Sequence, residues 1–235
     1  MALKAVFFDA AGTLFKTVRP VGESYARFAQ KYGMDVAPAD LSARFHVRFS
    51  DAPPLAFPGA PPDQIPQLER DWWKNLVREI FQPWGPFRDF EEYFSDLFAY
   101  FKRADSWSLY ADTVETLSTL KGRGFILVVV SNFDSRVLGI IEGLGIAPWF
   151  DSVIISSQVG YAKPAPEIFH SALSLHELDA DEALHIGDSL DKDVAGARNA
   201  GLTGVWLNRR GFSAAGSSTE VRSLNELVAI ADRLS

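Results

Sequence analysis

The sequence of 235 residues contains no cysteine. This absence excludes disulfide bonds, thiolate metal sites and a cysteine nucleophile, so any nucleophile must be Ser, Thr, Asp, Glu, Lys or His. Basic residues are also in deficit, because 23 Lys and Arg stand against 30 Asp and Glu and leave a net charge of −7. Clustered Lys and Arg bind nucleic acids and anionic membranes, so we expect neither as a partner.

A long hydrophobic run is missing from the start of the sequence, where only a few apolar residues precede Asp9. We therefore predict neither a secretory signal peptide nor a transmembrane helix there, and we expect a cytoplasmic location. Hydrophobic residues nevertheless make up 47% of the chain. That proportion is enough to bury a sizeable core, as one large domain or as a domain that carries an insert.

Short apolar runs alternate with helical patterns over most of the chain. The runs are bounded by Gly, Asp, Ser or Asn, and they cover residues 5–8, 125–130, 153–155, 183–186 and 204–207. Such runs are typical of buried parallel strands. Between them, apolar residues recur at helical spacing, as at Val114, Leu117 and Leu120. Strands that alternate with helices predict an α/β fold with a doubly wound parallel sheet.

Residues 16–105 interrupt this alternation. Three segments place large apolar side chains on one helical face each: Val21, Tyr25, Phe28 and Tyr32; Leu68, Trp72, Leu76 and Ile80; and Phe90, Phe94, Leu97 and Phe101. We predict a helical insert whose aromatic rings fill a small core of its own, with a loop over the proline-rich residues 51–66. The predicted domains are a sheet core, residues 1–15 and 106–235, and a helical domain, residues 16–105.

Polar residues follow the predicted strands at several points. They are Asp9 with Gly12 and Thr13, Ser131 with Asn132, Lys163, and Asp188 with Ser189 and Asp193. Taken alone, each of them also fits a structural role, since Asp, Ser and Asn often cap helices. Open α/β sheets, however, bind ligands beyond the carboxyl ends of their strands. Together these residues would bring a carboxylate nucleophile, a hydroxyl, an ammonium and a second carboxylate to one edge of the sheet.

The segments around these residues resemble the four motifs of the haloacid dehalogenase-like (HAD) hydrolase superfamily. DAAGTLF resembles the first motif, SNFD the second, the Lys of YAKPAP the third and GDSLDKD the fourth. The resemblance covers residues 1–15 and 106–235, and the insert lies where the family carries an α-helical cap over its site. It implies a Rossmann-like core with an inserted α-helical cap domain, and an aspartyl-enzyme mechanism with Mg²⁺.

The residue types fit the roles that this resemblance implies for the reaction. Asp9 can attack a phosphorus or carbon centre and form a covalent intermediate, which splits one difficult displacement into two easier ones. Lys163 would be the second catalytic residue, because its fixed positive charge restrains repulsion between the carboxylates. We expect Ser131, Asn132 and Thr13 to bind the substrate phosphate. The predicted substrate is a small phosphorylated metabolite.

The same resemblance implies the ligands of a Mg²⁺ ion. Asp9 and Asp188 would bind the ion, the backbone carbonyl of Ala11 would add a ligand, and Asp193 would orient the metal shell. Ala11 is also a departure from the family pattern. Phosphatases of this family carry there a second Asp, which protonates the leaving group and later deprotonates water. An alanine side chain has no proton to donate.

Three interpretations of Ala11 stay open at this point. Phosphonoacetaldehyde hydrolases also carry Ala there, but they need a Schiff-base lysine in the cap. No context distinguishes one of the candidates, which are Lys16, Lys31, Lys74 and Lys102. The 2-haloacid dehalogenases also lack the second Asp and need no metal, but Asp188 in the fourth motif argues against them. The third interpretation is a phosphatase restricted to good leaving groups, or a protein that binds a ligand or partner without hydrolysis.

The remaining polar residues give no further site. The histidines lack ligand spacing and are interpreted as structural: His46, His170, His176 and His185. The sequence leaves open whether four residues of the insert face a pocket or fill its core: Arg19, Glu23, Trp72 and Trp73. It predicts no oligomeric state.

Overall fold

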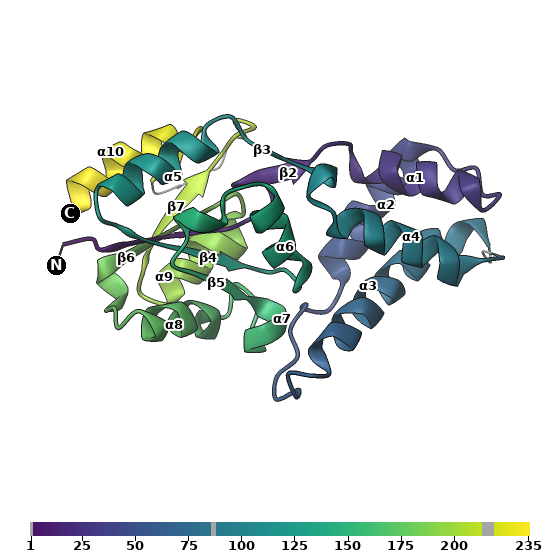
Figure 1. Ribbon diagram of the computed structural model, residues 1–235, viewed down its shortest axis with the longest axis horizontal. Coiled ribbons are helices and arrows are strands. Elements are labelled where there is room, and N and C mark those ends of the chain that lie inside the picture. Colours follow the sequence, from purple (N-terminus) through teal and green to yellow (C-terminus); the bar gives the residue numbers. More distant parts are fainter. Residues whose placement is uncertain (1, 86–87, 213–218) are drawn as a thin grey trace.

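The computed structural model describes residues 2–85, 88–212 and 219–235, which form two lobes (Figure 1). One lobe contains a parallel six-stranded sheet and both ends of the chain. Its strands, in spatial order, are β5 (Ser152–Ile155), β4 (Ile126–Ser131), β1 (Ala5–Phe8), β6 (Ala183–Gly187), β7 (Thr203–Leu207) and β8 (Glu220–Val221). The order of the strands places β1 in the interior of the sheet, between β4 and β6.

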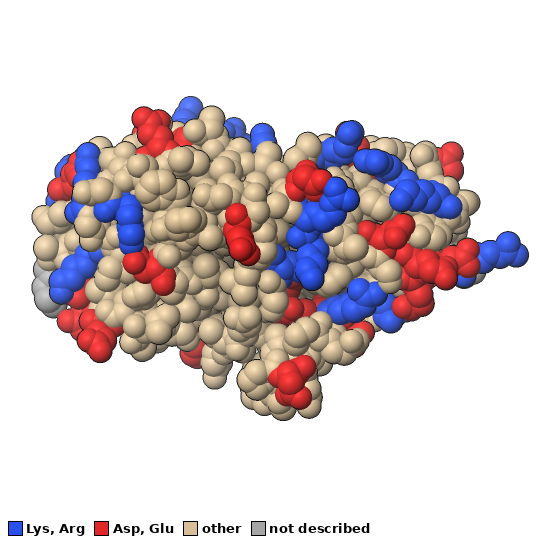
Figure 2. Space-filling model, viewed as in Figure 1, with Lys and Arg blue, Asp and Glu red and all other residues tan. Residues whose placement is uncertain are grey.

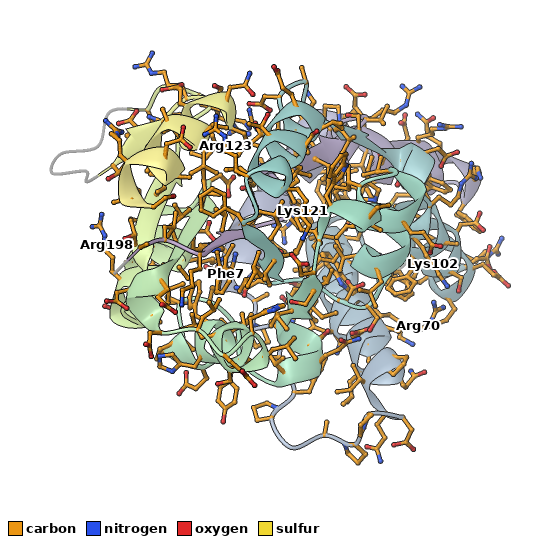
Figure 3. The ribbon with its side chains drawn as sticks, turned by 60° about the vertical axis from the view of Figure 1, so that its left-hand side comes forward. Phe7, Arg70, Lys102, Lys121, Arg123 and Arg198 are labelled. Atoms are coloured by element: carbon orange, nitrogen blue, oxygen red, sulfur yellow. The ribbon has the colours of Figure 1, made fainter. Side chains whose placement is uncertain are left out.

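Helices cover both faces of this sheet. On one face lie α5 (Thr113–Gly122), α6 (Arg136–Gly143) and α10 (Asn225–Leu234); on the other lie α8 (Pro166–Leu175) and α9 (Gly196–Asn199). Successive side chains of a strand point to opposite faces. In β1, accordingly, Val6 and Phe8 enter the first of these two clusters, while Ala5 and Phe7 enter the second, and all four are fully buried (Phe7 is labelled in Figure 3). A strand buried on both faces gives the continuous apolar run seen in the sequence.

The second lobe, which we call the cap, consists of helices. They are α1 (Val21–Lys31), α2 (Pro38–Asp51), α3 (Ile65–Phe81) and α4 (Phe90–Lys102). Their apolar faces meet in a separate cluster that includes Tyr25, Leu76, Ile80 and Phe94. The chain passes between the lobes through an antiparallel pair, β2 (Phe15–Thr17) and β3 (Trp107–Leu109).

This architecture confirms the predicted α/β fold with a doubly wound parallel sheet and an inserted set of helices. Residues 52–64, most of the proline-rich stretch, contain neither helix nor strand. The sequence pattern did not predict α2, β2, β3 or β8. β2, β3 and β8 have only two or three residues and leave no periodic signal. α2 does carry a helical pattern, with Leu41, Phe45 and Phe49 four residues apart, and this pattern was not assigned to a helix. The exact domain boundaries stay a prediction. In the described part of the chain, no helix is both long and apolar enough to span a bilayer.

Candidate active site

Neighbouring strands bring the predicted site residues to one edge of the sheet. Asp9 directly follows β1, Ser131 is the last residue of β4, and Asp188 directly follows β6. Asp193 belongs to η5, a π-helical turn that covers Leu190–Ala195. Because β4 and β6 flank β1 in parallel, their carboxyl ends lie on either side of Asp9.

The carboxylate of Asp9 is buried and held by two donors. Its Oδ1 accepts hydrogen bonds from Lys163 Nζ at 2.7 Å and from Ser131 Oγ at 3.0 Å. Only 8% of the residue is exposed. Among the described residues, none donates a hydrogen bond to the second oxygen, Oδ2. One oxygen of Asp9 is therefore fixed, and the other is available for chemistry.

Lys163 joins Asp9 to a second buried carboxylate. Its Nζ also donates to Asp193 Oδ1 at 2.6 Å. Burial alone would lower the pKa of Lys163, but the charges and hydrogen bonds of Asp193 and Asp9 outweigh it and raise the pKa above its usual value. Burial alone would likewise raise the pKa of Asp193, but Lys163 and His185 lower it. The Lys163 ammonium and the Asp193 carboxylate are therefore charged near neutral pH.

His185 supports Asp193 from the sheet below it. The ring lies on β6, is fully buried, and its Nε2 donates to Asp193 Oδ1 over 3.0 Å. Burial and the neighbouring Lys163 lower the pKa of His185, so the imidazole is neutral, with its proton on the nitrogen that faces the carboxylate. The other Asp193 oxygen accepts the Ser189 backbone N–H at 2.9 Å. With both oxygens engaged, Asp193 is fixed in position.

Asp188 completes a group of three carboxylates. Oxygens of Asp9, Asp188 and Asp193 lie within 4.8 Å of one another. Although Asp188 is the exposed member, loss of hydration and the negative charges of Asp9 and Asp193 raise its pKa to about 7. Such crowding of carboxylates is unfavourable without a counter-charge. Oxygen-only ligands in this arrangement suit Mg²⁺, so the residues fit the predicted metal.

Two glycines allow this close approach. Gly12 has a φ of +96°, and a Cβ built on it would lie 2.5 Å from Asp188 Oδ2. Gly187 at the end of β6 would place a Cβ 2.1 Å from Asp193 Cγ. Any side chain at either position would collide with a carboxylate of the group. The glycines of DAAGTLF and GDSLDKD are thus required by the geometry of the site.

Of the three predicted phosphate-binding residues, Ser131 and Asn132 line the cavity beside Asp9, and phosphate binding by all three stays a prediction. The Asn132 side chain donates to the Lys163 carbonyl at 2.9 Å and accepts the Lys163 backbone N–H at 2.7 Å, so its amide positions Lys163. Thr13 is fully buried and does not line the cavity beside Asp9. Its hydroxyl has no hydrogen-bond partner in the described part of the chain. Of the three residues, only Ser131 contacts the Asp9 carboxylate.

A cavity of about 820 Å³ extends from Asp9 into the cap. Asp9, Ala11, Ser131, Lys163 and Asp188 line its inner part, and side chains from α1, α2, α3 and α4 line much of the rest. Among the candidates left open by the sequence, the cavity is lined by Lys16 and Trp73, but not by Arg19, Glu23, Trp72, Lys31, Lys74 or Lys102. His46, which the sequence led us to interpret as structural, lines it as well. Figure 2 shows several Lys and Arg side chains on the cap close to its boundary with the core.

Contacts between cap and core were not predicted. Asp134 is fully buried and accepts hydrogen bonds from Arg136 Nε at 2.8 Å and from Trp73 Nε1 of the cap at 2.6 Å. Glu69 of α3 accepts the backbone N–H of Ser135 at 3.0 Å, and two serine hydroxyls of the core also donate to it. The position of Asp134 in the second motif is the one feature of the sequence that could have indicated its role in this contact. No feature of the sequence indicates the role of Glu69, because its partners lie 66 or more positions away.

Comparisons with known proteins find related hydrolases. A family model for haloacid dehalogenase-like hydrolases matches residues 3–201. The haloacid dehalogenase-like hydrolase domain-containing protein 3 of Danio rerio is 32% identical over 214 residues, which cover 87% of this chain and 85% of the relative. The phosphoserine phosphatase of Thermus thermophilus is 29% identical over 225 residues, 88% of this chain and 89% of that protein.

A solved structure has the same fold. The HAD phosphatase from Thermococcus onnurineus matches with a TM-score of 0.68 and 27% identity, over 97% of both chains. The parallel sheet, the carboxylates at its edge and the inserted helices are those of a hydrolase with a Rossmann-like α/β core. The chain belongs to the haloacid dehalogenase-like hydrolases, which confirms the family that its four motifs predicted.

Proposed function

We propose that this chain is a Mg²⁺-dependent hydrolase that cleaves small phosphorylated molecules through an aspartyl phosphate at Asp9. The observation that carries the proposal is the pair of hydrogen bonds from Lys163 and Ser131 to Asp9 Oδ1, with no donor to Oδ2 in the part of the chain that the structure describes. Phosphoryl transfer depends mainly on positioning and on neutralising charge. The phosphatases among the relatives and solved structures support the same reaction class.

In the first step, Asp9 Oδ2 attacks the phosphorus atom and forms an O–P bond. The bond from phosphorus to the leaving oxygen breaks, and its electron pair stays on that oxygen. The positive charge of Lys163 offsets the negative charges of Asp9 and Asp193. The Ser131 hydroxyl donates a hydrogen bond to the attacking carboxylate. In the second step, water attacks the phosphorus of the aspartyl phosphate, and the bond from phosphorus to Asp9 Oδ2 breaks with its electron pair on the carboxylate. Phosphate leaves, the proton of the water passes to solvent, and Asp9 is restored.

The metal would be held by Asp9 and Asp188, with the Ala11 carbonyl as a further ligand. When bound, Mg²⁺ supplies positive charge next to the phosphoryl oxygens. Asp193 has both oxygens engaged by the protein, so in this proposal it positions Lys163 and the Ser189 backbone instead of binding the ion directly.

The experiment is phosphate release from a panel of phosphorylated metabolites, with and without Mg²⁺. We expect turnover with Mg²⁺ only, and we expect Asp9→Asn to abolish it while the fold is retained, because an amide keeps the shape but cannot attack as an anion. Activity retained in Asp9→Asn would remove Asp9 from the mechanism. No release from any phosphoester would favour the rival function, a binding protein, and chloride release from 2-haloacids would favour a dehalogenase.

Metal binding can be measured apart from turnover, by calorimetry at millimolar Mg²⁺. Asp188→Ala should lose the binding signal, because it removes one of the carboxylates of the site. Asp191→Ala is the matched control, since Asp191 is exposed in η5 and lies outside the group of three carboxylates. Equal Mg²⁺ binding by both variants would contradict the assigned ligands.

A further inference from the structure

Aromatic rings form a continuous series along the cavity. The series runs through Phe133, Trp107, Phe101, Tyr25, Phe45 and Phe49, and all six residues line the cavity. The centroids of successive rings are 5.9, 6.2, 6.1, 5.9 and 5.3 Å apart. These separations are those of interacting aromatic pairs. One wall of the cavity is therefore built of rings.

The series begins next to the nucleophile and ends in the cap. Phe133 lies two residues after Ser131, whose hydroxyl bonds Asp9 Oδ1 at 3.0 Å. Phe49 lies on α2 of the cap, and 37% of it is exposed. A ligand whose reacting atom is at Asp9 would therefore extend along aromatic side chains as it enters the cap.

These rings do more than fill the core of the cap. Tyr25 is fully enclosed, but Phe45, Phe101 and Trp107 are half-buried and Phe49 is exposed. Trp73 stacks on Phe49 with 5.9 Å between centroids and 21° between planes. Burial of exposed apolar ring surface is favourable, so an apolar ligand that covers these rings would bind more tightly.

Trp73 is also fixed in orientation. Its indole N–H donates to the fully buried Asp134 at 2.6 Å, and the Arg136 guanidinium lies 5.0 Å from its ring centroid. A ring that is held in place loses little conformational freedom when a ligand binds to it. The cap thus presents a preorganised aromatic surface rather than adaptable side chains.

The chemistry at Ala11 selects the same kind of ligand independently. Ala11 lines the inner part of the cavity and has no proton to give to a leaving oxygen. An alkoxide is a poor leaving group without protonation, whereas a phenolate is the anion of an acid with a pKa of about 10. A substrate that leaves as a phenolate needs no general acid.

We infer that the substrates are aryl phosphate monoesters, an inference that rests on the proposed phosphatase function. The ring lies against the aromatic wall of the cavity, and the phosphate lies at Asp9. When Asp9 Oδ2 forms its bond to phosphorus, the bond from phosphorus to the ring oxygen breaks. Both electrons stay on that oxygen, and the phenolate takes its proton from solvent.

Four phosphates separate the contribution of the ring from that of the leaving group. Phenyl phosphate has a ring and a good leaving group, benzyl phosphate a ring and a poor one, acetyl phosphate only a good leaving group, and ethyl phosphate neither. We expect phenyl phosphate to have a lower KM than acetyl phosphate, and benzyl phosphate a lower KM than ethyl phosphate. We expect phenyl and acetyl phosphate to have a higher kcat than benzyl and ethyl phosphate.

Variants of α2 test the wall itself. Phe49→Ala should raise KM for phenyl and benzyl phosphate about two- to tenfold, from the usual strength of one aromatic contact, and leave acetyl phosphate unchanged. Phe49→Tyr keeps a ring and should keep the KM of the native chain. Val47→Ala is the matched control, because Val47 is on the same helix, is 57% exposed and does not line the cavity.

The outcomes separate this inference from the proposed function. If acetyl and ethyl phosphate are hydrolysed with the same KM as the ring substrates, the aryl preference is wrong and the phosphatase function stands. An equal rise of KM for acetyl phosphate in Phe49→Ala would also overturn it. If none of the four is hydrolysed with Mg²⁺ present, the proposed function fails first.

Discussion

Ala11 lies two residues after the nucleophile, where phosphatases that the sequence resembles carry a second Asp. A positioned acid–base group contributes typically about 10²–10⁴ to a rate, or roughly 3–5 kcal/mol of the barrier. Ala11→Asp should therefore raise kcat for benzyl and ethyl phosphate, whose alkoxides need a proton. It should change kcat much less for phenyl and acetyl phosphate, which leave without one. Steady-state kinetics on the four substrates measures this difference.

The control for that variant is Ala11→Asn, which has nearly the same shape but cannot supply a carboxylic proton. A carboxylate so close to Asp9 can also weaken phosphate binding by repulsion, so kcat and KM must be separated. If Ala11→Asp folds, binds Mg²⁺ and gains nothing on the alkyl phosphates, another cavity residue already provides the proton. His46 is the imidazole that lines the cavity, and its Nδ1 lies 2.8 Å from the Ser42 carbonyl.

Asp112 connects elements that are distant in the sequence. It immediately precedes α5, and its carboxylate accepts both terminal nitrogens of Arg209, at 2.8 and 2.9 Å, and the backbone N–H of Leu224 before α10, at 2.8 Å. Burial alone would raise the pKa of Asp112, but these donors outweigh it and lower the pKa below its usual value. Arg209 also donates to the Thr13 carbonyl at 2.8 Å, which ties this network to the first motif.

Because the folded-state pKa of Asp112 is lowered, its contribution to stability is present above the unfolded value of about 3.9. It is lost as pH falls through the folded-state pKa. Asp112→Asn should therefore reduce the free energy of unfolding by about 1–3 kcal/mol at pH 7, and the deficit should shrink below about pH 4. Urea unfolding at several pH values measures this. Asp181→Asn, at an exposed carboxylate, is the control, and an equal deficit at every pH would contradict the prediction.

The elements that the sequence predicted well are those with a strong periodic signal. β1 and β4 are buried on both faces and read as apolar runs, whereas β2 and β3 have only three residues each. Pairing between β2 and β3 joins residues about 90 positions apart, as Phe15 with Leu109, and no local pattern encodes it. Such contacts depend on the tertiary fold.

The candidate site divides in the same way. The motif order was enough to bring Asp9, Lys163 and Asp193 together, because parallel strands end at one edge. The sequence did not assign His185 to the site, since a buried histidine on a strand looks the same whether or not it bonds a carboxylate. It also did not show that the Asn132 amide turns to the Lys163 backbone, because side-chain direction follows from packing.

The cap and the core meet through buried polar contacts as well as through the β2–β3 pair. Glu69 on α3 is 3% exposed, and its Oε1 accepts the Ser135 backbone N–H, the Ser135 hydroxyl at 2.8 Å and the Ser157 hydroxyl at 2.6 Å. Ser135 precedes α6, and Ser157 lies in α7 (Ser156–Val159). Nearby, the Ser156 hydroxyl donates to the Leu55 carbonyl of the cap at 2.6 Å. These contacts hold the cap against the edge of the sheet that carries Asp9.

Glu69→Ala should remove all the hydrogen bonds that Glu69 makes between the cap and the core. The change leaves the buried donors of Ser135 and Ser157 without their acceptor, so we expect a loss of about 2–4 kcal/mol in the free energy of unfolding. Ser157→Ala removes one donor and leaves the Glu69 carboxylate with the other two, so its cost should be smaller, about 1 kcal/mol. Urea unfolding gives both values, and Glu79→Ala, at an exposed position on the same helix, is the matched control.

Hydrogen exchange tests whether that loss falls on the contact between the lobes. In Glu69→Ala, the amide of Ser135 and the start of α6 should exchange faster, because the hydrogen bond to the Glu69 carboxylate that protects this N–H is gone. Residues 52–64 should also exchange faster, since Leu55 depends on the same docking. The interior strands β1 and β4 should keep their protection relative to global unfolding. Uniform acceleration over both lobes, with no excess at Ser135 or residues 52–64, would show that Glu69 stabilises the whole fold and does not specifically hold the cap closed over Asp9.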